Sequence, residues 1–307
     1  MAILVAGATG LAGSAISRRL KESGHKVIDV NSSIVDLRDR SATFEFLHSV
    51  KPDVVIDAAA KVGGIGANNS LPVDFLSVNL QIQTNLMDAA HSANVERFIF
   101  LGSSCIYPRN CPQPIKEEYL LTGPLEETNS AYALAKIAGL ELIRSYRKQF
   151  GRKWVSLMPT NLYGPGDNFN LEVAHVLAAL VNRFVSASLA GITEVTLWGS
   201  GTPRREFLHV DDLATAVEVV LEKYDDSIHL NVGTGVDLTI KELAEVVASI
   251  SGYSGKILWD SSKPDGTPRK ILEISRISAL GWSPTITLEQ GIREVVEYFK
   301  NSETVRR

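Results

Sequence analysis

Near its N-terminus the chain reads Ile3-Leu-Val-Ala-Gly7-Ala-Thr-Gly10-Leu-Ala-Gly13. The apolar run predicts a strand buried on both faces, and the glycines predict a tight turn into a helix. Glycine lets the backbone approach a phosphate closely, and the free N–H groups of a helix N-terminus attract anions. The pattern therefore favours a dinucleotide-binding turn over an ordinary turn that binds no ligand. We expect cofactor contacts at Gly7, Thr9, Gly10, Leu11 and Gly13.

Strands and helices alternate beyond this turn. An apolar stripe from Leu11 to Leu20 predicts the first helix, and Gly24 stands where such a helix ends. Next come a strand over 25–30, a helix over 41–50, a strand over 54–56, a helix over 78–93 and a strand over 97–101. Units of this length imply parallel strands joined by right-handed crossovers. We predict an α/β fold, with a Rossmann-like doubly wound parallel sheet and a smaller, discontinuous C-terminal lobe.

The pattern loosens in the second half of the chain. After residue 166 we predict helices over 171–188, 212–222 and 240–250, an irregular segment over 198–203 and a turn-rich stretch from Lys263. A chain of 307 residues is long enough for two lobes. We expect a dinucleotide-binding Rossmann domain over 1–165, to which part of 207–232 returns, and a substrate-binding lobe over 166–307.

Composition narrows the classes of partner. The formal net charge of −4 argues against a nucleic-acid partner, because such proteins usually carry a basic face. The two cysteines, Cys105 and Cys111, are too few for a disulfide framework or a Cys-rich zinc site, and we expect no metal. No stretch reaches the roughly 18 apolar residues of a membrane span, and no leader-like segment precedes the first strand. We expect a cytoplasmic protein without a membrane partner.

Three residues supply the chemistry of a carbonyl redox centre. Tyr132 and Lys136 lie one turn apart on one face of a predicted helix, and Ser103 follows the strand over 97–101. Ser103 would polarise a carbonyl oxygen, and Tyr132 would pass a proton to it. We expect the Lys136 cation and a nicotinamide ring to favour the phenolate of Tyr132. Tyr-x-x-x-Lys alone is common on helices, so its value depends on the glycine turn before it.

Several longer segments resemble one enzyme family. The sequence is similar to the GDP-L-fucose synthase family of extended short-chain dehydrogenases, also named GDP-4-keto-6-deoxy-D-mannose 3,5-epimerase-4-reductases. The matching segments are 58–64, 101–108, 132–139, 158–165, 198–203, 205–212 and 263–270. Gly102-Ser-Ser-Cys-Ile-Tyr-Pro108 is the most specific of them, and the likeness spans nearly the whole chain.

The resemblance implies an epimerisation pair. In that family one pocket epimerises the sugar at C3 and C5, and NADPH then reduces the C4 ketone. The resemblance assigns Cys105 as the base and His175 as the acid that returns the proton from the other face. Taken without the resemblance, both residues would more often be packing residues. We expect the cation that favours a Cys105 thiolate to be His175 or the nicotinamide ring.

The resemblance also implies the remaining contacts. The cofactor would meet Asp36 and Leu37 at the adenine and Pro159, Asn161 and Leu162 at the nicotinamide, with Lys136 and His175 alongside. The Asp36 position is equally typical of a helix cap. A nucleotide-sugar substrate would meet Arg183, Trp198, Arg205 and Asp265, because arginine binds a diphosphate in pairs of oxygens and tryptophan stacks on rings.

The choice between NADP and NAD depends on positions where the chain departs from the family. The family commonly has His-Arg in place of Ala8-Thr9 and further arginines in place of 30–33, which would pair with the 2′-phosphate of NADP. NADP(H) is expected from the resemblance, with neutral hydrogen bonds from Asn31, Ser32 and Ser33 and help from Arg38. NAD stays open, since Asp29 could bind ribose hydroxyls.

Two other functions are compatible with the same fold. One is an NAD-dependent nucleotide-sugar 4-epimerase or dehydratase, which the presence of Cys105 disfavours. The other is a redox-inert dinucleotide-binding regulator, against which the joint presence of Tyr132 and Lys136 speaks. Related enzymes pair two helices of each subunit, so we expect a homodimer through the helices over 78–93 and 130–149.

Overall fold

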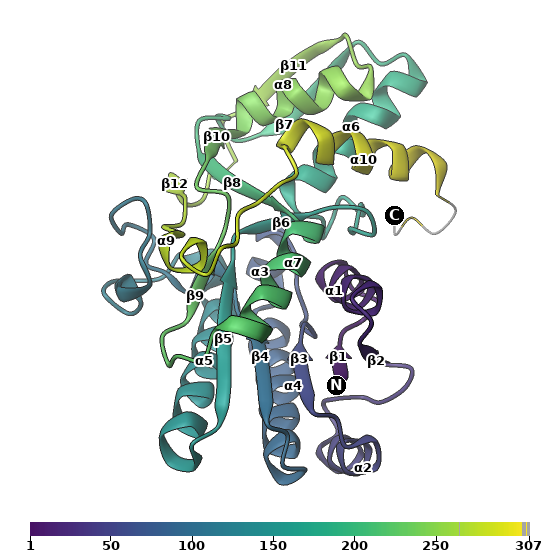
Figure 1. Cartoon of the computed structure of the whole chain (residues 1–307). Helices are drawn as coiled ribbons and strands as arrows, with labels where there is room; N and C mark the ends of the chain where they lie inside the picture. The colour runs from purple at the N-terminus through teal and green to yellow at the C-terminus, as the bar shows by residue number, and fades with distance from the viewer. Residues whose placement is uncertain (264, 303–304, 306–307) are drawn as a thin grey trace.

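A six-stranded sheet forms the centre of the computed structural model, which describes residues 1–263, 265–302 and 305. The strand order is β2-β1-β3-β4-β5-β9, and every neighbouring pair is parallel. The strands are β1 (Ala2–Ala6), β2 (Lys26–Val30), β3 (Val54–Asp57), β4 (Arg97–Leu101), β5 (Lys153–Pro159) and β9 (Leu230–Val232). The predicted doubly wound parallel sheet is confirmed (Figure 1).

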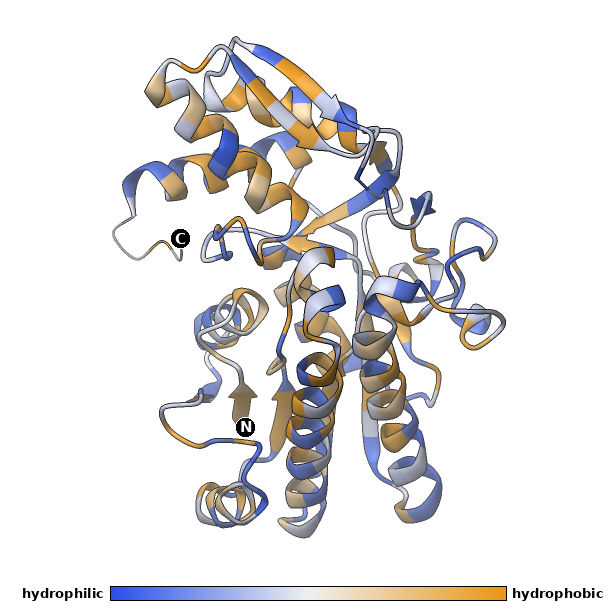
Figure 2. Ribbon diagram, turned by 180° about the vertical axis from the view of Figure 1, so that it is seen from behind, coloured by the Kyte–Doolittle hydropathy of each residue, from blue (hydrophilic) through white to orange (hydrophobic). Residues whose placement is uncertain are grey.

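Helices cover both faces of this sheet, because successive strand residues point to opposite sides. Ile3 and Val5 pack with α1 (Leu11–Glu22) and α7 (Val210–Lys223) in one core. Residues of the opposite parity pack with the other helices, which are α2 (Arg40–Val50), α4 (Pro72–Ser92) and α5 (Ser130–Phe150). Figure 2 shows the sheet mainly in orange, with orange and blue residues mixed on the long helices in front of it.

A second core lies beyond the carboxyl ends of the strands, in the upper part of Figure 1. Its helices are α6 (Val176–Ala190), α8 (Ile240–Ser251) and α10 (Leu288–Asn301), and the paired strands β7 (Glu194–Trp198) and β11 (Lys256–Asp260) pack on them. A small sheet links the two cores. It contains β6 (Asn161–Tyr163), β8 (Arg204–His209), β10 (Asp237–Thr239) and β12 (Arg269–Lys270). The short helices are α3 (Ile65–Ser70) and α9 (Ser275–Ser278).

Two predicted helix starts are wrong. The helix expected over 78–93 begins at Pro72, which is well suited to the first helical position because its φ is fixed and it needs no N–H partner. The helix expected over 171–188 begins at Val176 instead. The preceding backbone is held in turns by side chains, since the amides of Asn168, Asn170 and Glu172 donate to side-chain oxygens one or two residues earlier.

The remaining predicted elements agree with the structure to within one or two residues. The irregular segment over 198–203 separates β7 from β8, and the stretch from Lys263 precedes β12, with residue 264 outside the described residues. In the part of the chain that the structure describes, no helix combines the length and the apolar character needed to cross a bilayer.

Candidate active site

The site is a cavity of about 540 Å³ at the carboxyl ends of the central strands. Ligands of open parallel sheets bind in this position, at the point where the strand order reverses. Here β1 is that point, with β2 on one side and β3 on the other. The cavity lining includes Gly10, Leu11, Ser103, Cys105, Tyr132, Pro159, Asn161, Leu162, His175 and Arg205. The structure therefore brings ten of the predicted site residues around one cavity.

The glycine turn is held too tightly for any side chain at two positions. Gly7 has φ of 77°, and a Cβ there would lie 2.8 Å from the Ala58 carbonyl oxygen. A Cβ on Gly13 would lie 2.1 Å from the Gly7 carbonyl oxygen, so α1 rests directly on the turn. Gly10 begins the helix without a side-chain cap. The first N–H groups of α1 are thus left for a ligand beside the cavity.

Lys136 and Ser103 are fixed against Tyr132. The Lys136 ammonium donates to the Leu101 carbonyl oxygen at 2.9 Å and lies 5.9 Å from the centre of the Tyr132 ring. Ser103 caps the short turn that follows β4, its oxygen accepting from the Cys105 amide at 3.2 Å. The Ser103 hydroxyl also forms a hydrogen bond with the Tyr132 phenol. The predicted trio of redox residues therefore forms one contiguous group.

The Tyr132 phenol holds its proton more tightly than we expected, because its pKa is raised and not lowered. Burial raises the pKa of Tyr132 above its usual range, the charge of Cys105 raises it further, and the Ser103 hydrogen bond lowers it. The expected phenolate is thus disfavoured in the free protein, because burial in a low dielectric penalises the charged form. A neutral phenol is the form that can donate a proton to an oxygen.

A buried carboxyl beneath Lys136 was missed by the sequence reasoning. Asp57 ends β3 with no solvent exposure, and burial raises its pKa to about 6 although Lys136 opposes the rise. Burial in turn lowers the pKa of Lys136 to about 8, and Asp57 partly restores it. In the sequence, Asp57 directly follows the apolar run of β3. A carboxyl at the end of a buried strand was the only indication that it belongs to the site.

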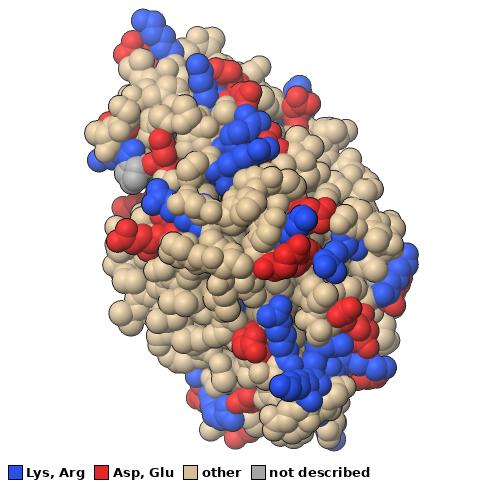
Figure 3. Space-filling view, turned by 90° about the vertical axis from the view of Figure 1, so that its left-hand side faces the viewer, with Lys and Arg blue, Asp and Glu red and all other residues tan. Residues whose placement is uncertain are grey.

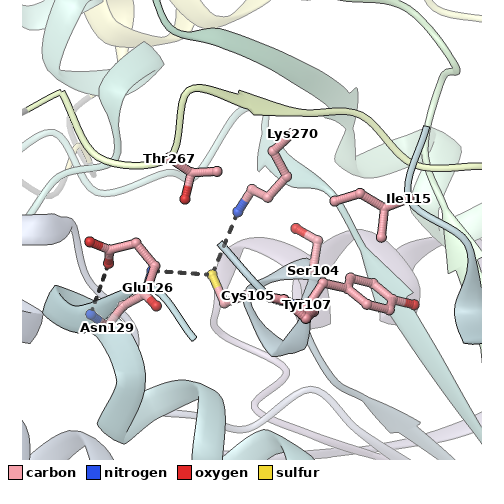
Figure 4. A pocket seen from close by; sticks show the side chains of 9 residues that line it. Ser104, Cys105, Tyr107, Ile115, Glu126, Asn129, Thr267 and Lys270 are labelled. Atoms are coloured by element: carbon pink, nitrogen blue, oxygen red, sulfur yellow. Dashed lines mark hydrogen bonds between the residues drawn. The ribbon is translucent and has the colours of Figure 1, made fainter. Parts of the chain in front are cut away.

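Cys105 lies half-buried in the cavity wall with two donors on its sulfur. The Lys270 Nζ is 3.7 Å from Sγ and the Asn129 Nδ2 is 3.8 Å from it, as Figure 4 shows. Sequence reasoning missed both donors. Lys270 ends a segment that carried the family resemblance, and Asn129 stands directly before the helix of Tyr132. Neither position has a local pattern that predicts a contact with sulfur.

His175 lies outside the helix on which we expected it. It is the N-terminal cap residue of α6, and its side chain is exposed and lines the cavity. Desolvation by the surrounding protein lowers the pKa of His175, and the charge of Lys270 lowers it further. The imidazole is therefore neutral in the free protein, and Lys270 instead of His175 is the cation in contact with Cys105. Gly64 fixes the segment ahead of His175 by donating to the Val173 carbonyl oxygen at 2.9 Å.

On the predicted nicotinamide side, Pro159 ends β5, and Asn161 and Leu162 lie on β6. All three line the cavity, but the Asn161 amide already donates to the Glu206 carbonyl oxygen at 2.7 Å. One of the two donor hydrogens expected for a carboxamide is therefore used within the protein.

The predicted contacts for substrate are only partly gathered. Arg205 lines the cavity, whereas Arg183, Trp198 and Asp265 are described but lie outside its lining. Trp198 is 64% exposed, with the Lys263 Nζ 5.7 Å from the centre of its ring. Asp265 accepts from the Ser200 amide at 2.8 Å. These three residues stay predictions.

The residues around the expected 2′-phosphate are paired with each other. The Asp36 carboxylate accepts three hydrogen bonds from the Arg38 side chain, which hold the pKa of Asp36 at about 2. Leu37 is buried in the sheet core. Asp29 accepts from the Ser17 hydroxyl at 2.5 Å and pairs with Lys21 of α1. Neither Asp29 nor Arg38 is thus available without giving up an existing partner.

Charges are mixed on the surface. On the face drawn in Figure 3, Lys and Arg side chains are interspersed with Asp and Glu. An anionic ligand would therefore be met by single placed cations, of which Arg205 and Lys270 line the cavity. Within the described residues, no group of three or more His, Cys, Asp or Glu side chains is placed to hold a metal ion.

Known proteins resemble this chain over both cores. Residues 3–233 match the NAD dependent epimerase/dehydratase family. GDP-L-fucose synthase 1 of Arabidopsis thaliana is 51% identical over 302 residues, covering 97% of this chain and 93% of that protein. GDP-L-fucose synthase of Escherichia coli (strain K12) is 48% identical over 307 residues, covering 97% and 96%. A GDP-L-fucose synthetase structure from Naegleria fowleri bound to NADP is 32% identical, with a TM-score of 0.91 and coverage of 100% and 95%.

Proposed function

The chain belongs to the NAD dependent epimerase/dehydratase family, and we propose that it works within that family as a GDP-L-fucose synthase. The reaction is 3,5-epimerisation of GDP-4-keto-6-deoxy-D-mannose, followed by NADPH-dependent reduction at C4 to GDP-L-fucose. The observation that carries the proposal is one cavity lined by Ser103, Tyr132, Cys105 and His175. A plain 4-epimerase has no need of a polarised cysteine beside its redox residues.

The epimerisation half uses the acidity that a C4 ketone gives to the hydrogens on C3 and C5. Cys105 removes such a proton, and the electron pair of the C–H bond moves onto the C4 oxygen as an enolate. Ser103 and Tyr132 donate hydrogen bonds to that oxygen and stabilise its charge. His175 takes up a proton from solvent and returns it to the opposite face of the carbon, so that the centre is inverted.

The reductive half uses the same hydrogen-bond donors. NADPH, when bound, would supply the hydride that adds to C4. Tyr132 then gives its proton to the C4 oxygen, which suits a phenol whose pKa is raised by burial. Lys136 holds its charge beside the phenol through the Leu101 carbonyl, and Ser103 positions the oxygen. The uncapped N-terminus of α1 would hold the cofactor pyrophosphate, with Lys136, Pro159, Asn161, Leu162 and His175 beside its nicotinamide end.

NADP is the cofactor we propose, supported by the NADP-bound relative from Naegleria fowleri. The 2′-phosphate would displace Asp36 from Arg38, because both bind the same guanidinium. We also propose a homodimer through α4 and α5, on which Val73 is 73% and Leu134 is 49% exposed. The proposed domains are 1–165 with part of 207–232, and 166–307.

The test is stoichiometry with isotope incorporation. Purified protein with GDP-4-keto-6-deoxymannose in D₂O should consume one NADPH per product and place deuterium at C3 and C5. Cys105→Ser should lose the deuterium, and NADP should bind more tightly than NAD. A 4-epimerase or dehydratase would recycle its cofactor without net consumption, and a redox-inert regulator would bind NADP without turnover. Either result would overturn the proposal.

A further inference from the structure

The contacts of the Cys105 sulfur differ from those of the other cysteine. Sγ of Cys105 lies 3.7 Å from the Lys270 ammonium and 3.8 Å from the Asn129 amide nitrogen. Cys111 is also half-buried, but its sulfur lies near the neutral amide of Gln113 at 3.9 Å, and burial raises the pKa of its thiol. Of these two half-buried cysteines, only Cys105 therefore has a cation at its sulfur among the described contacts.

We propose that Lys270 and Asn129 hold Cys105 as a thiolate, which makes Lys270 a catalytic residue that touches the reacting sulfur. The ammonium attracts the sulfur charge, and the amide donates a hydrogen bond to it. The role in turnover rests on the proposed function, in which Cys105 is the base. The thiolate itself is a property of the free protein and can be tested without substrate.

Lys270 is free to serve the sulfur. Within the described part of the chain, no carboxylate oxygen lies within 4.0 Å of its ammonium, and Sγ of Cys105 is its hydrogen-bond acceptor. The backbone around Lys270 is fixed from two sides. Lys270 pairs with Arg205 in the β12–β8 ladder, and the Leu272 amide donates to the buried Glu206 carboxylate at 3.0 Å. The ammonium therefore projects from a rigid segment.

Asn129 is oriented by a carboxylate on its own segment. Glu126 is buried, and its Oε2 accepts from the Asn129 backbone amide at 3.2 Å and from the Thr128 hydroxyl at 2.6 Å. These bonds fix the residue whose side chain faces Sγ. They also occupy the Glu126 oxygen, which limits the repulsion that this carboxylate exerts on a thiolate.

Among the described residues, the charged groups in the cavity wall around the sulfur favour the anion. Lys270 comes from β12 and Arg205 from β8, and the charge of Cys105 raises the pKa of Arg205 against the effect of burial. Glu126 lines the same wall, and Tyr132 is neutral. His175 also lines the cavity, where desolvation lowers the pKa of its imidazole and the charge of Lys270 lowers it further. Two cations thus oppose one hydrogen-bonded carboxylate.

The thiolate fits the first step of the reaction. Its lone pair forms the S–H bond, the C–H bond breaks, and the electron pair passes to the C4 oxygen. The ammonium of Lys270 keeps its proton throughout. With the thiolate held by Lys270 and Asn129, no other group has to remove the thiol proton before turnover.

The experiment measures the alkylation rate of each cysteine in the free protein from pH 5 to 10, with iodoacetamide and peptide mass spectrometry. Alkylation follows the thiolate fraction, and an unperturbed thiol has a midpoint near 8.5. We expect the Cys105 midpoint to lie below that value and the Cys111 midpoint above it. Lys270→Met should raise the Cys105 midpoint by about one pH unit, a roughly tenfold slower reaction at pH 7.

The controls separate charge from folding. Lys270→Arg should keep most of the effect, and Asn129→Ala should give a smaller shift than Lys270→Met. Lys241→Met removes the same charge from the exposed start of α8 and should leave the Cys105 midpoint unchanged. Equal Cys105 midpoints in the wild type and Lys270→Met would overturn the proposal. A shifted midpoint in a protein that places no deuterium in the sugar would support the thiolate and refute the proposed function.

Discussion

The packing of α1 on the glycine turn gives a sharp prediction for Gly13→Ala. The new methyl group would lie 2.1 Å from the Gly7 carbonyl oxygen and 2.7 Å from its carbon. Ordinary contacts are near 3.5 Å, so the helix would have to withdraw by more than about 1 Å. The turn has little room to retreat, because even a Cβ on Gly7 would lie 2.8 Å from backbone atoms of Ala58 and Ala59. Overpacking of this kind costs about 1–3 kcal/mol, and we expect the upper half of that range.

Two measurements follow from the same displacement. The free energy of unfolding, measured by urea denaturation, should fall by about 2–3 kcal/mol. The Kd for NADPH should rise at least tenfold, because the N–H groups of α1 would move away from the pyrophosphate. A loss of only about 1.4 kcal/mol of binding free energy is enough for that change. A thermal melt with and without NADPH should show a smaller ligand-induced rise in Tm.

Gly66→Ala is the matched control. Gly66 lies in α3, nothing lies within 4 Å of the position that its Cβ would take, and its φ is not positive. Alanine is the better helix former by about 1 kcal/mol, so this variant should be as stable as the wild type or more so. If Gly13→Ala matched the control in both stability and NADPH affinity, the close approach of helix and turn would not be what shapes the cofactor site.

Three further predictions concern the buried polar groups. Tyr132→Phe should slow C4 reduction by about 10²–10⁴-fold and leave NADPH affinity unchanged, and full reduction in the variant would remove the phenol from the mechanism. As the pH rises from 4 to 7, the wild type should lose about 3 kcal/mol of unfolding free energy that Asp57→Asn does not lose. The folded wild type holds the proton of Asp57 up to about pH 6 whereas the unfolded chain releases it near 3.8, so wild-type stability falls as pH rises through that window; parallel urea curves would contradict this. Glu206→Gln should cost about 1–3 kcal/mol, because the carboxylate accepts from the amides of Thr234, Gly235 and Leu272 and an amide group can replace only one of its oxygens. The exposed Glu245→Gln should cost nothing measurable in the same denaturation assay, and an equal loss in both variants would refute that account.

The sequence predicted the sheet well because its signals are local. A buried strand followed by glycines and an amphipathic helix repeats along the first hundred residues, and right-handed crossovers then leave few topologies. The start of α6 was predicted wrongly for a local reason as well. The apolar period extends back toward residue 171, but side-chain oxygens from Asp167 to Asn170 take the backbone amides first.

Local patterns predicted Ser103, Tyr132 and Lys136, whereas Cys105, His175 and Arg205 were expected only from the family resemblance. Tyr132 and Lys136 share a helix face, and Ser103 and Cys105 share a turn after β4. Lys270 contacts Cys105 across 165 residues of chain, and such a contact has no spacing from which it could be predicted. Asp57 presents the same difficulty. Its partner Lys136 lies on α5, and the sequence shows only that a strand ends in a carboxyl.

The order of the strands bears on how the protein is made. β9, at residues 230–232, completes one edge of the central sheet beside β5, and α7 covers the face on which α1 packs. A ribosome must therefore synthesise the chain past residue 232 before the cofactor half can close. Until then the nascent chain exposes an unpaired edge at β5 and an uncovered apolar face, which are the features that chaperones bind and that lead to aggregation.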